Sequence, residues 1–303
     1  MLSEKKSAAE FRQEFRRELA SGRLLRFPGA FSPLVAMLIA ELKFEGVYIS
    51  GAALSADLGL PDIGLTTLSE VAGRAEAITR SVNLPTIVDI DTGFGEPANV
   101  ARTICAMEQA GLAGCHLEDQ LFPKRCGHLD GKQLVSVEDM VRKVKAAVDA
   151  KADQSFLIIA RTDARGVDGL DAAIERAKRY VDAGAEMVFP EALSNEQEFA
   201  AFRKAMDVPL MANMTEFGKS PLLTTKQLTN LGYNLVIYPV TALRLAMKAI
   251  EDGFRTLAAE GTQESVVKDM QTRQRLYELL GYEKYAAIDE ALFNFKLKDG
   301  TTL

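Results

Sequence analysis

The stretch TIVDIDTGFGEPANVARTICAMEQAGLAGCHLED, residues 86–119, contains one complete repeat of the fold. It begins with the apolar run Thr86 to Asp91, continues through an amphipathic segment that predicts a helix, and ends with a second apolar run, Gly114 to Asp119. Ala110-Gly111 marks the end of the helix, because glycine readily adopts the left-handed backbone that stops one. A strand, a helix and a strand in this order predict a parallel β-α-β unit.

The same alternation runs along most of the chain. The strand candidates are Leu24 to Pro28, Val47 to Gly51, Thr86 to Asp91, Gly114 to Asp119, Phe156 to Asp163, Glu186 to Glu191, Pro209 to Met214 and Leu235 to Val240. Eight strands separated by helices predict an α/β fold of the (β/α)8 TIM-barrel type. A doubly wound sheet is the alternative. It is disfavoured because Gly93-Phe94-Gly95 follows the third strand candidate and lacks the third glycine of a dinucleotide-binding turn.

We expect a single domain made of four segments. Phe11, Phe15 and Leu19 lie on one face of a predicted N-terminal helix. After the last strand candidate, about fifty residues read as helices, which is more than a barrel needs. The segments are an N-terminal helix at 1–22, the barrel at 23–240, C-terminal helices at 241–293 and a tail at 294–303.

Composition limits the function classes. The 303 residues carry a net charge of −6 and no cluster of basic and aromatic residues, which argues against a nucleic-acid partner. The uncharged run Phe27 to Ala40 is too short to span a membrane. The opening residues mix Glu with Arg, unlike a secretory signal, and three cysteines are too few for a disulfide framework. We therefore expect a cytoplasmic protein.

Polar residues gather where the predicted strands end, and active sites of barrels lie at this end of the strands. Taken in order from the second strand candidate to the eighth, the groups are Tyr48, Ser50 and Gly51; Asp89 and Asp91; His116 and Glu118; Arg161 and Asp163; Glu191; Asn213 and Thr215; and Tyr238, with Arg244 slightly beyond the last strand.

Asp89 and Asp91 share one face of their strand, because side chains alternate with a period of two. Burying two carboxylates together costs several kcal/mol without a cation, so a hard divalent metal explains the pair. Mg²⁺ or Mn²⁺ fits carboxylate and water ligands. An isolated Asp-x-Asp pair is more often a solvated loop or a helix cap, but this pair ends an apolar run. Glu118 ends the neighbouring strand, where it is placed to orient a metal-bound water.

Lys124-Arg-Cys-Gly-His128 places a thiol between cations, which predicts a lowered pKa for Cys126; an ordinary basic surface loop is the alternative. Lys124, Arg161 and Arg244 are expected to converge on a ligand with several carboxylates or a phosphate. Arg161 has a second interpretation, as an internal partner of Asp163 or Glu191.

Three further residues are weighed the same way. His116 is interpreted as a packed strand residue in preference to a metal ligand. Cys105 and Cys115 are interpreted as buried structural thiols.

Six motifs run in order along nearly the whole chain: Asp89-Ile-Asp-Thr-Gly-Phe-Gly95, Leu117-Glu-Asp-Gln120, Lys124-Arg-Cys-Gly-His128, Ala160-Arg-Thr-Asp163, Phe189-Pro-Glu-Ala192 and Asn213-Met-Thr-Glu-Phe-Gly218. With them the chain resembles the methylisocitrate lyase family of the isocitrate lyase and phosphoenolpyruvate mutase superfamily. The Lys-Arg-Cys-Gly-His loop points to the carbon–carbon lyases, since mutases and phosphonate hydrolases look different there. Isocitrate lyases proper carry a related loop but are usually longer.

The resemblance implies Mg²⁺-dependent cleavage of 2-methylisocitrate to pyruvate and succinate, in the methylcitrate cycle of propionate degradation. It implies that Asp89 and Asp91 hold Mg²⁺, directly or through water, with Glu118 in support. Cys126 would protonate the succinate carbanion, while Arg161 and Lys124 would stabilise developing charge. The base stays open between Tyr48 and metal-bound water. The alternatives are a related lyase acting on isocitrate, dimethylmalate or oxaloacetate, and a catalytically idle binding module.

The resemblance also assigns substrate contacts. The pyruvate carboxylate would meet Ser50, Gly51 and Ala52, and Ala52 departs from the family, which commonly has glycine there. Phe189 and Leu235 are candidates for the wall of a methyl pocket. A homotetramer built from dimers that exchange a helix is implied as well. The remaining residues implied to border the substrate are Cys126, Gly127, His128, Arg161, Glu191, Asn213, Met214, Thr215, Arg244 and Arg273.

Overall fold

The computed structural model describes residues 6–295. These residues divide into two compact units, which are described separately: Lys6 to Arg244, and Leu245 to Phe295.

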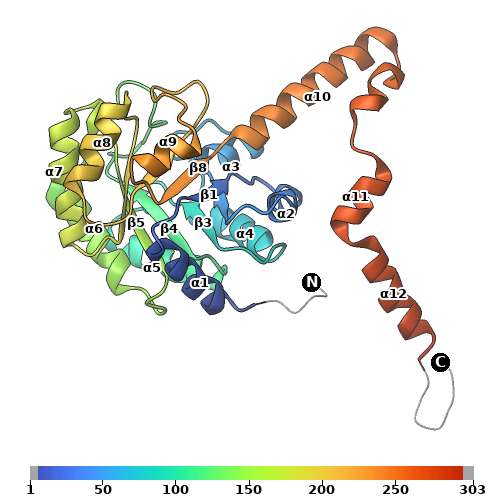
Figure 1. The fold of residues 1–303 in the computed structure, drawn as a ribbon, viewed down its shortest axis with the longest axis horizontal. Coiled ribbons are helices and arrows are strands. Elements are labelled where there is room, and N and C mark those ends of the chain that lie inside the picture. Colours follow the sequence, from blue (N-terminus) through green and yellow to red (C-terminus); the bar gives the residue numbers. More distant parts are fainter. Residues whose placement is uncertain (1–5, 296–303) are drawn as a thin grey trace. The chain divides into compact units, whose positions relative to one another are not determined.

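The first unit is a closed parallel barrel (Figure 1). Hydrogen bonding joins β1, β8 and β7 in one sheet and β2 to β6, in sequence order, in another. Bridges between Gly29 and Tyr48 and between Val188 and Leu210 connect the two sheets, so the strands follow one another around a ring. The predicted barrel is thereby confirmed. Its strands are β1 (Leu25–Pro28), β2 (Val47–Ile49), β3 (Thr86–Asp89), β4 (Gly114–Glu118), β5 (Leu157–Thr162), β6 (Met187–Pro190), β7 (Met211–Asn213) and β8 (Leu235–Tyr238).

Helices follow the strands and begin at capping residues that the sequence supplies. Thr67 and Glu70 form a capping box at the start of α4, and the Ser136 hydroxyl caps α6. Gly111 and Gly184 follow α5 and α7 with left-handed backbones, as the Ala-Gly pairs predict. The unit contains α1 (Ala8–Ala20), α2 (Pro33–Glu41), α3 (Gly51–Asp57), α4 (Leu68–Thr79), α5 (Pro97–Gln109), α6 (Val137–Asp149), η1 (Ala164–Gly166), α7 (Leu170–Asp182), α8 (Glu196–Ala205), α9 (Thr225–Asn230) and the start of α10 (Thr241–Glu260).

Side chains alternate between the two faces of each strand, which divides the core into a cluster inside the barrel and clusters between the strands and the helices. Phe27, Tyr48, Ile87 and Ile159 belong to one buried cluster inside the barrel, whereas neighbours such as Val88 pack outward against helices. This division decides which side chains can reach the rim of the barrel.

Helix α1 closes the amino-terminal end of the barrel. Phe15 joins the inner cluster, where its ring centroid lies 5.3 Å from that of Phe27. The Arg12 guanidinium donates to the carbonyl of Leu112, just before β4. Leu235 begins β8 in register with Leu25, so it lies at this closed end and not at the rim. The interpretation of Leu235 as part of a methyl pocket is therefore wrong.

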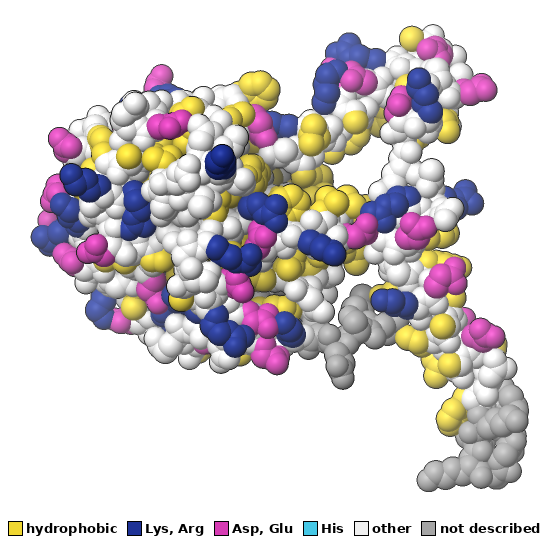
Figure 2. Space-filling model, in the orientation of Figure 1, with side chains coloured by type: hydrophobic (Ala, Val, Ile, Leu, Met, Phe, Trp, Pro, Cys, Tyr) yellow, Lys and Arg dark blue, Asp and Glu magenta, His cyan; other side chains and the backbone are white. Residues whose placement is uncertain are grey.

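The second unit consists of helices, as predicted for this part of the chain. They are the rest of α10, η2 (Glu264–Asp269), α11 (Arg273–Leu280) and α12 (Tyr282–Phe293). None of the described residues in these elements is buried. Large apolar side chains such as Leu245, Phe254 and Phe293 are mostly exposed, and Figure 2 shows apolar groups along these helices. Across residues 6–295, none of the helices combines the length and apolar character needed to cross a membrane.

Candidate active site

Two carboxylates stand at the end of β3. The Asp89 carboxylate accepts hydrogen bonds from the amides of Asp91 (3.0 Å) and Gly51 (3.3 Å). A β-carbon at position 51 would lie 2.9 Å from an Asp89 oxygen, so only glycine allows α3 to begin this close to the carboxylate. Asp91 has a left-handed backbone (φ 48°), an uncommon conformation that is concentrated at functional sites.

Arg161 lies among three buried carboxylates, one just beyond the end of its own strand β5 and two from the ends of the neighbouring strands β4 and β6. Its Nη1 lies 3.1 Å from Glu118, its Nε 2.9 Å from Asp163, and its Nη2 3.4 Å from Glu191. The sequence left Arg161 open between a ligand-facing cation and an internal ion-pair partner, and the structure shows the ion pairs. Burial raises the pKa of Glu118 well above its ordinary value. Neither Glu118 oxygen accepts a hydrogen bond from the described residues.

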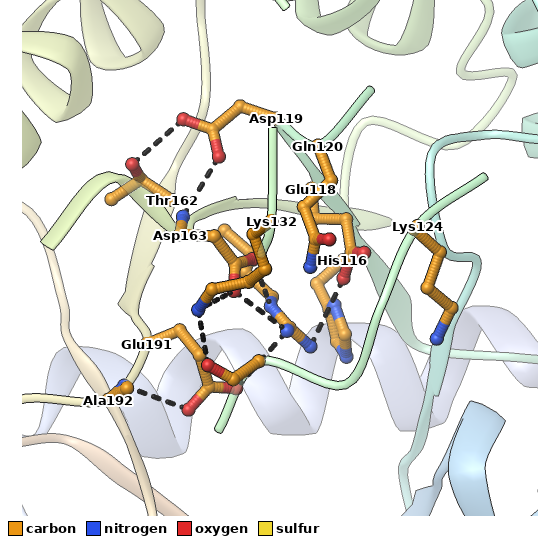
Figure 3. Close-up of polar contacts among 12 residues, drawn as sticks. His116, Glu118, Asp119, Gln120, Lys124, Lys132, Thr162, Asp163, Glu191 and Ala192 are labelled. Atoms are coloured by element: carbon orange, nitrogen blue, oxygen red, sulfur yellow. Dashed lines mark hydrogen bonds and ion pairs between the residues drawn. The ribbon is translucent and has the colours of Figure 1, made fainter. Parts of the chain in front are cut away.

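Asp119 follows the end of β4 and is fully buried. Figure 3 shows its carboxylate hydrogen-bonded to Thr162 and Asp163, at the end of β5. Its carboxylate accepts hydrogen bonds from the Thr162 hydroxyl, the Asp163 amide and the Tyr180 hydroxyl, each at 2.8 Å. These bonds fix the end of β5, and hence the backbone that carries Arg161 and Asp163.

The loop between β4 and α6 carries Lys124 over the carboxylates. Its ammonium group lies 2.7 Å from Asp91 and also bonds Asp62, and its side chain is buried. Neighbouring carboxylates raise its pKa despite that burial. Asp62 lies in the loop after α3 and was missed by the sequence analysis, because no periodic pattern singles it out.

The expected lowering of the Cys126 pKa is wrong. Burial raises the pKa of this thiol, and the charge of Asp62 adds to the effect. Lys124 is paired with Asp62 and Asp91, while the Arg125 guanidinium donates to the carbonyl of Asp130. Neighbours in sequence therefore do not determine the charge around this sulfur. Cys126 is a protonated thiol, which is the form a general acid requires.

Gly127 and His128 pack against the same strand ends. A β-carbon on Gly127 would lie 2.5 Å from Nη2 of Arg161 and would also strike Glu191, so glycine is required here. His128 Nε2 lies 3.0 Å from Glu191, and the Asn213 amide lies 3.3 Å from the same carboxylate. Burial opposes ionisation of Glu191, but Arg161 and His128 outweigh it and hold its pKa well below the ordinary value.

Tyr48 and His116 form a buried pair beneath the carboxylates. The Tyr48 hydroxyl lies 2.8 Å from His116 Nε2, and His116 Nδ1 lies 3.7 Å from Asp89. Burial lowers the pKa of His116 to about 4, so the imidazole is neutral, as expected for a packed strand residue. Burial also raises the pKa of Tyr48 well above its ordinary value, which disfavours a role as a base.

Met214, Arg244 and Arg273 are three further predicted site residues. Met214 belongs to the outer core cluster, so its side chain does not face the rim. The Arg244 guanidinium lies 3.8 Å from Glu216 and over the ring of Phe217. Arg273 begins α11 in the second unit.

The remaining predictions concern small substrate-contact residues and two cysteines. The Ser50 hydroxyl caps α3 by accepting from the amide of Ala53, and the partly buried Ala52 follows in that helix. The Thr215 amide donates to the Asn213 side chain. Cys115 is buried as expected, but Cys105 is exposed on α5, because it faces away from the core-facing residues of that helix.

The carboxylates fit a hard cation by their chemistry. Both oxygens of Glu118 and one oxygen of Asp91 are buried and accept no well-aligned hydrogen bond from the described residues, although Arg161 lies 3.1 Å from Glu118 and Lys124 lies 2.7 Å from Asp91 as ion-pair partners. Oxygen ligands and a small number of carboxylates suit Mg²⁺, which keeps several waters. Within residues 6–295, no three His, Cys, Asp or Glu side chains are grouped closely enough to hold a metal without rearrangement. The ammonium group of Lys124 lies against Asp91.

Comparison with known proteins identifies the family. The model of the phosphoenolpyruvate phosphomutase family matches residues 15–258. A Corynebacterium glutamicum protein named probable 2-methylisocitrate lyase 2 is 55% identical, covering 97% of this chain and 96% of its own length. The 2-methylisocitrate lyase of Bacillus subtilis is 44% identical, covering 99% of both chains. The chain belongs to the 2-methylisocitrate lyase branch of the phosphoenolpyruvate mutase family. The resemblance drawn from the six motifs is thus confirmed.

Solved structures of the superfamily share the fold of this lyase-family chain. A 2,3-dimethylmalate lyase aligns with a TM-score of 0.88 and 31% identity over 98% of this chain and 99% of its own. A phosphonopyruvate hydrolase in complex with oxalate and Mg²⁺ aligns with a TM-score of 0.85 and 32% identity over 94% of this chain and 99% of its own.

Proposed function

We propose that this chain is a Mg²⁺-dependent carbon–carbon lyase that cleaves 2-methylisocitrate to pyruvate and succinate, in the methylcitrate cycle of propionate degradation. The observation that carries the proposal is the seating of the Cys126 loop on the strand ends, where Gly127 packs against Arg161 and Glu191. This geometry sets the residue that follows the thiol directly against a buried guanidinium. Relatives at 44–55% identity over nearly the whole chain bear the name of this activity.

The charges of the site support a divalent cation. The site contains six carboxylates and three permanently charged cations, so ionisation of every carboxylate would leave twice as many negative as positive charges. Such an excess of negative charge is costly in a buried site. Bound at Asp89 and Asp91, Mg²⁺ would act as a Lewis acid on oxygen atoms of the substrate. The carboxylates are Asp62, Asp89, Asp91, Glu118, Asp163 and Glu191, and the cations are Lys124, Lys132 and Arg161.

Protein groups account for the proton and charge transfers. Cleavage breaks the bond between the hydroxyl-bearing carbon and its neighbour, the hydroxyl gives its proton to a water molecule of the site as a pyruvate carbonyl forms, and the succinate carbon takes a proton. Cys126 supplies that last proton, because its raised pKa keeps the thiol protonated. Arg161 and Lys124 stabilise the negative charge that develops. The high pKa of Tyr48 favours a hydrogen-bond donor role for its hydroxyl.

Substrate carboxylates would occupy two sides of the site in this proposal. The pyruvate portion would meet Ser50, Gly51 and Ala52 at the start of α3. The backbone around Met214 would contribute in place of its side chain, which faces the outer core. The remaining proposed contacts are Gly127, His128, Glu191, Asn213, Thr215, Arg244 and Arg273.

We propose that the C-terminal helices pack on another copy of the chain, in a cytoplasmic homotetramer built from dimers. Helix α10 has no buried residue, and Leu245, Met247 and Phe254 are all exposed. Burying such a face is the general reason for a symmetric oligomer. Arg273 of α11 would reach a substrate site through this exchange.

The deciding experiment measures pyruvate release from 2-methylisocitrate and glyoxylate release from isocitrate side by side with Mg²⁺. We expect strong pyruvate release that falls ~10²–10⁴-fold in Cys126→Ser, the usual contribution of a general acid, and that stops with EDTA. Cys105→Ser is the matched control, because Cys105 is exposed on α5. Comparable or faster glyoxylate release would contradict the substrate assignment. Dimethylmalate and oxaloacetate belong in the panel, because superfamily structures at 31–34% identity carry those substrates in their names.

A further inference from the structure

Lys132 is a buried lysine six residues beyond Cys126, on the returning arm of the same loop. Its side chain is only 2% exposed. Its ammonium group donates to the carbonyl of Gly127 and lies 3.0 Å from the Asp163 carboxylate. In Figure 3, Lys132 and Lys124 extend on opposite sides of the site. A lysine is rarely buried unless its charge is used, so these two contacts require an explanation.

The two partners of Lys132 belong to different parts of the site. Gly127 follows Cys126 and packs against Arg161 and Glu191. Asp163 holds the Arg161 guanidinium through two hydrogen bonds, at 2.9 and 3.2 Å. One ammonium group therefore joins the backbone beside the thiol to the carboxylate that orients the guanidinium.

We propose that Lys132 is a positioning residue that fastens the Cys126 loop onto the strand ends and sets the thiol and Arg161 in one arrangement. The kinetic part of this inference rests on the proposed lyase function, whereas the loop anchoring does not. Other residues hold the rest of the loop, but the arm that follows the thiol needs a contact of its own. The stem of the loop is held by Gln120, which bonds the backbone of Arg125, and Lys124 holds the arm before the thiol. Lys132 holds the arm after it.

The test compares Lys132→Met with the wild type at saturating Mg²⁺. Methionine keeps much of the length and removes the charge and donors. Lys145→Met, an exposed lysine of α6 paired with Asp149, is the matched control. We expect kcat for pyruvate release to fall about 100-fold while KM changes little, because displacement of a reacting group by about 1 Å has this effect. Lys132→Arg keeps the charge and should recover part of the loss.

A second readout needs no substrate. Iodoacetamide labelling with peptide mapping follows Cys126, with exposed Cys105 as an internal reference. We expect Cys126 in Lys132→Met to react roughly tenfold faster, the change produced by losing one charge-assisted hydrogen bond, while Cys105 is unaffected. A residue that only stabilises the barrel would not change this ratio. If the wild type turns over no substrate, the lyase proposal fails and the labelling still tests the anchor.

A milder variant covers the case in which Lys132→Met does not fold. A β-carbon on Gly166 would lie 3.3 Å from the Lys132 ammonium nitrogen and 3.6 Å from Cε, so Gly166→Ala presses on the anchor without removing it. We expect the same two changes, smaller in size. Wild-type labelling of Cys126 in a folded Lys132→Met, or in Gly166→Ala where the former does not fold, would overturn the proposal. An unchanged kcat in an active enzyme would do so as well.

Discussion

Replacing Arg161 with methionine should destabilise the barrel in a way that depends on pH. The guanidinium contacts Glu118, Asp163 and Glu191, all of them buried. Breaking a buried ion pair by removing one partner typically costs about 3–5 kcal/mol. The penalties do not add for three carboxylates, because Asp163 retains Lys132 and Glu191 retains His128. Burial raises the pKa of Glu118 and so favours its neutral form, which makes its share of the penalty smaller than that of an ionised carboxylate.

We therefore expect a loss of about 3 kcal/mol at pH 7, equivalent to roughly 6–12 °C in the melting midpoint of a chain of this size. The sign of the pH dependence follows from Glu191. Its pKa is depressed in the wild type, so its stabilising contribution is present above its unfolded pKa and is lost as the pH falls. Removing Arg161 raises that pKa, so the penalty is fully present near neutrality and shrinks as the pH falls through the ordinary carboxyl range near about 4 and below it, toward the depressed wild-type pKa.

The assay is urea denaturation followed by far-UV circular dichroism at fixed protein concentration, from about pH 7 down to about pH 3, which spans the ordinary carboxyl pKa and part of the range below it. Arg142→Met is the control, because this exposed arginine pairs with exposed Asp139, a contact worth about 0–1 kcal/mol. A loss below about 1 kcal/mol at pH 7 would refute the reasoning about buried pairs. So would a penalty that stays constant or grows on acidification.

Two further outcomes test other parts of the structure. Truncation after Gly261 should give a monomer without turnover, because it removes the exposed apolar side chains of α11 and α12. Light scattering after size exclusion measures the mass of the truncated protein. An active oligomer would contradict the proposed role of these helices. Labelling of Cys126 at pH 8 should be slower than that of Cys105, and should accelerate as the pH rises through the raised thiol pKa. An equal rate would contradict the raised pKa, and faster labelling of Cys126 would support the lowered pKa that the sequence predicts.

The strand-end residues were predictable because one periodic rule governs them. Side chains alternate along a strand, so Asp89, Glu118 and Arg161 had to share the inner face once their strands were located. Parallel strands then bring their carboxyl ends to one rim. The register confirms this reasoning, since Glu118 pairs directly with Arg161 and Asp89 with His116. Only strand lengths differed: Gly51 starts a helix where the apolar run predicted strand.

The loop partners were not predictable, because no period relates them. Lys124 bonds Asp62, which lies 62 residues away, and Lys132 bonds Asp163, 31 residues away. Such pairs depend on how the loop folds over the rim. The Cys126 prediction failed for the same reason: adjacent cations in the sequence are engaged elsewhere in space, and burial controls the thiol. Lys132 showed no signal in the sequence beyond its nearness to the motif.

Variants of the loop test the reaction more directly than variants of the barrel, because the barrel is common to enzymes that bear the names of different reactions. Superfamily members share this fold but bear the names of different reactions, so the fold does not by itself select a chemistry. In this chain, the loop between β4 and α6 carries the proposed proton donor, and two lysines fasten it to the strand ends. If Lys124 and Lys132 hold the arms before and after Cys126, the strand ends supply the charge stabilisation and the loop supplies the proton. Loosening one arm should then impair turnover while leaving the barrel folded.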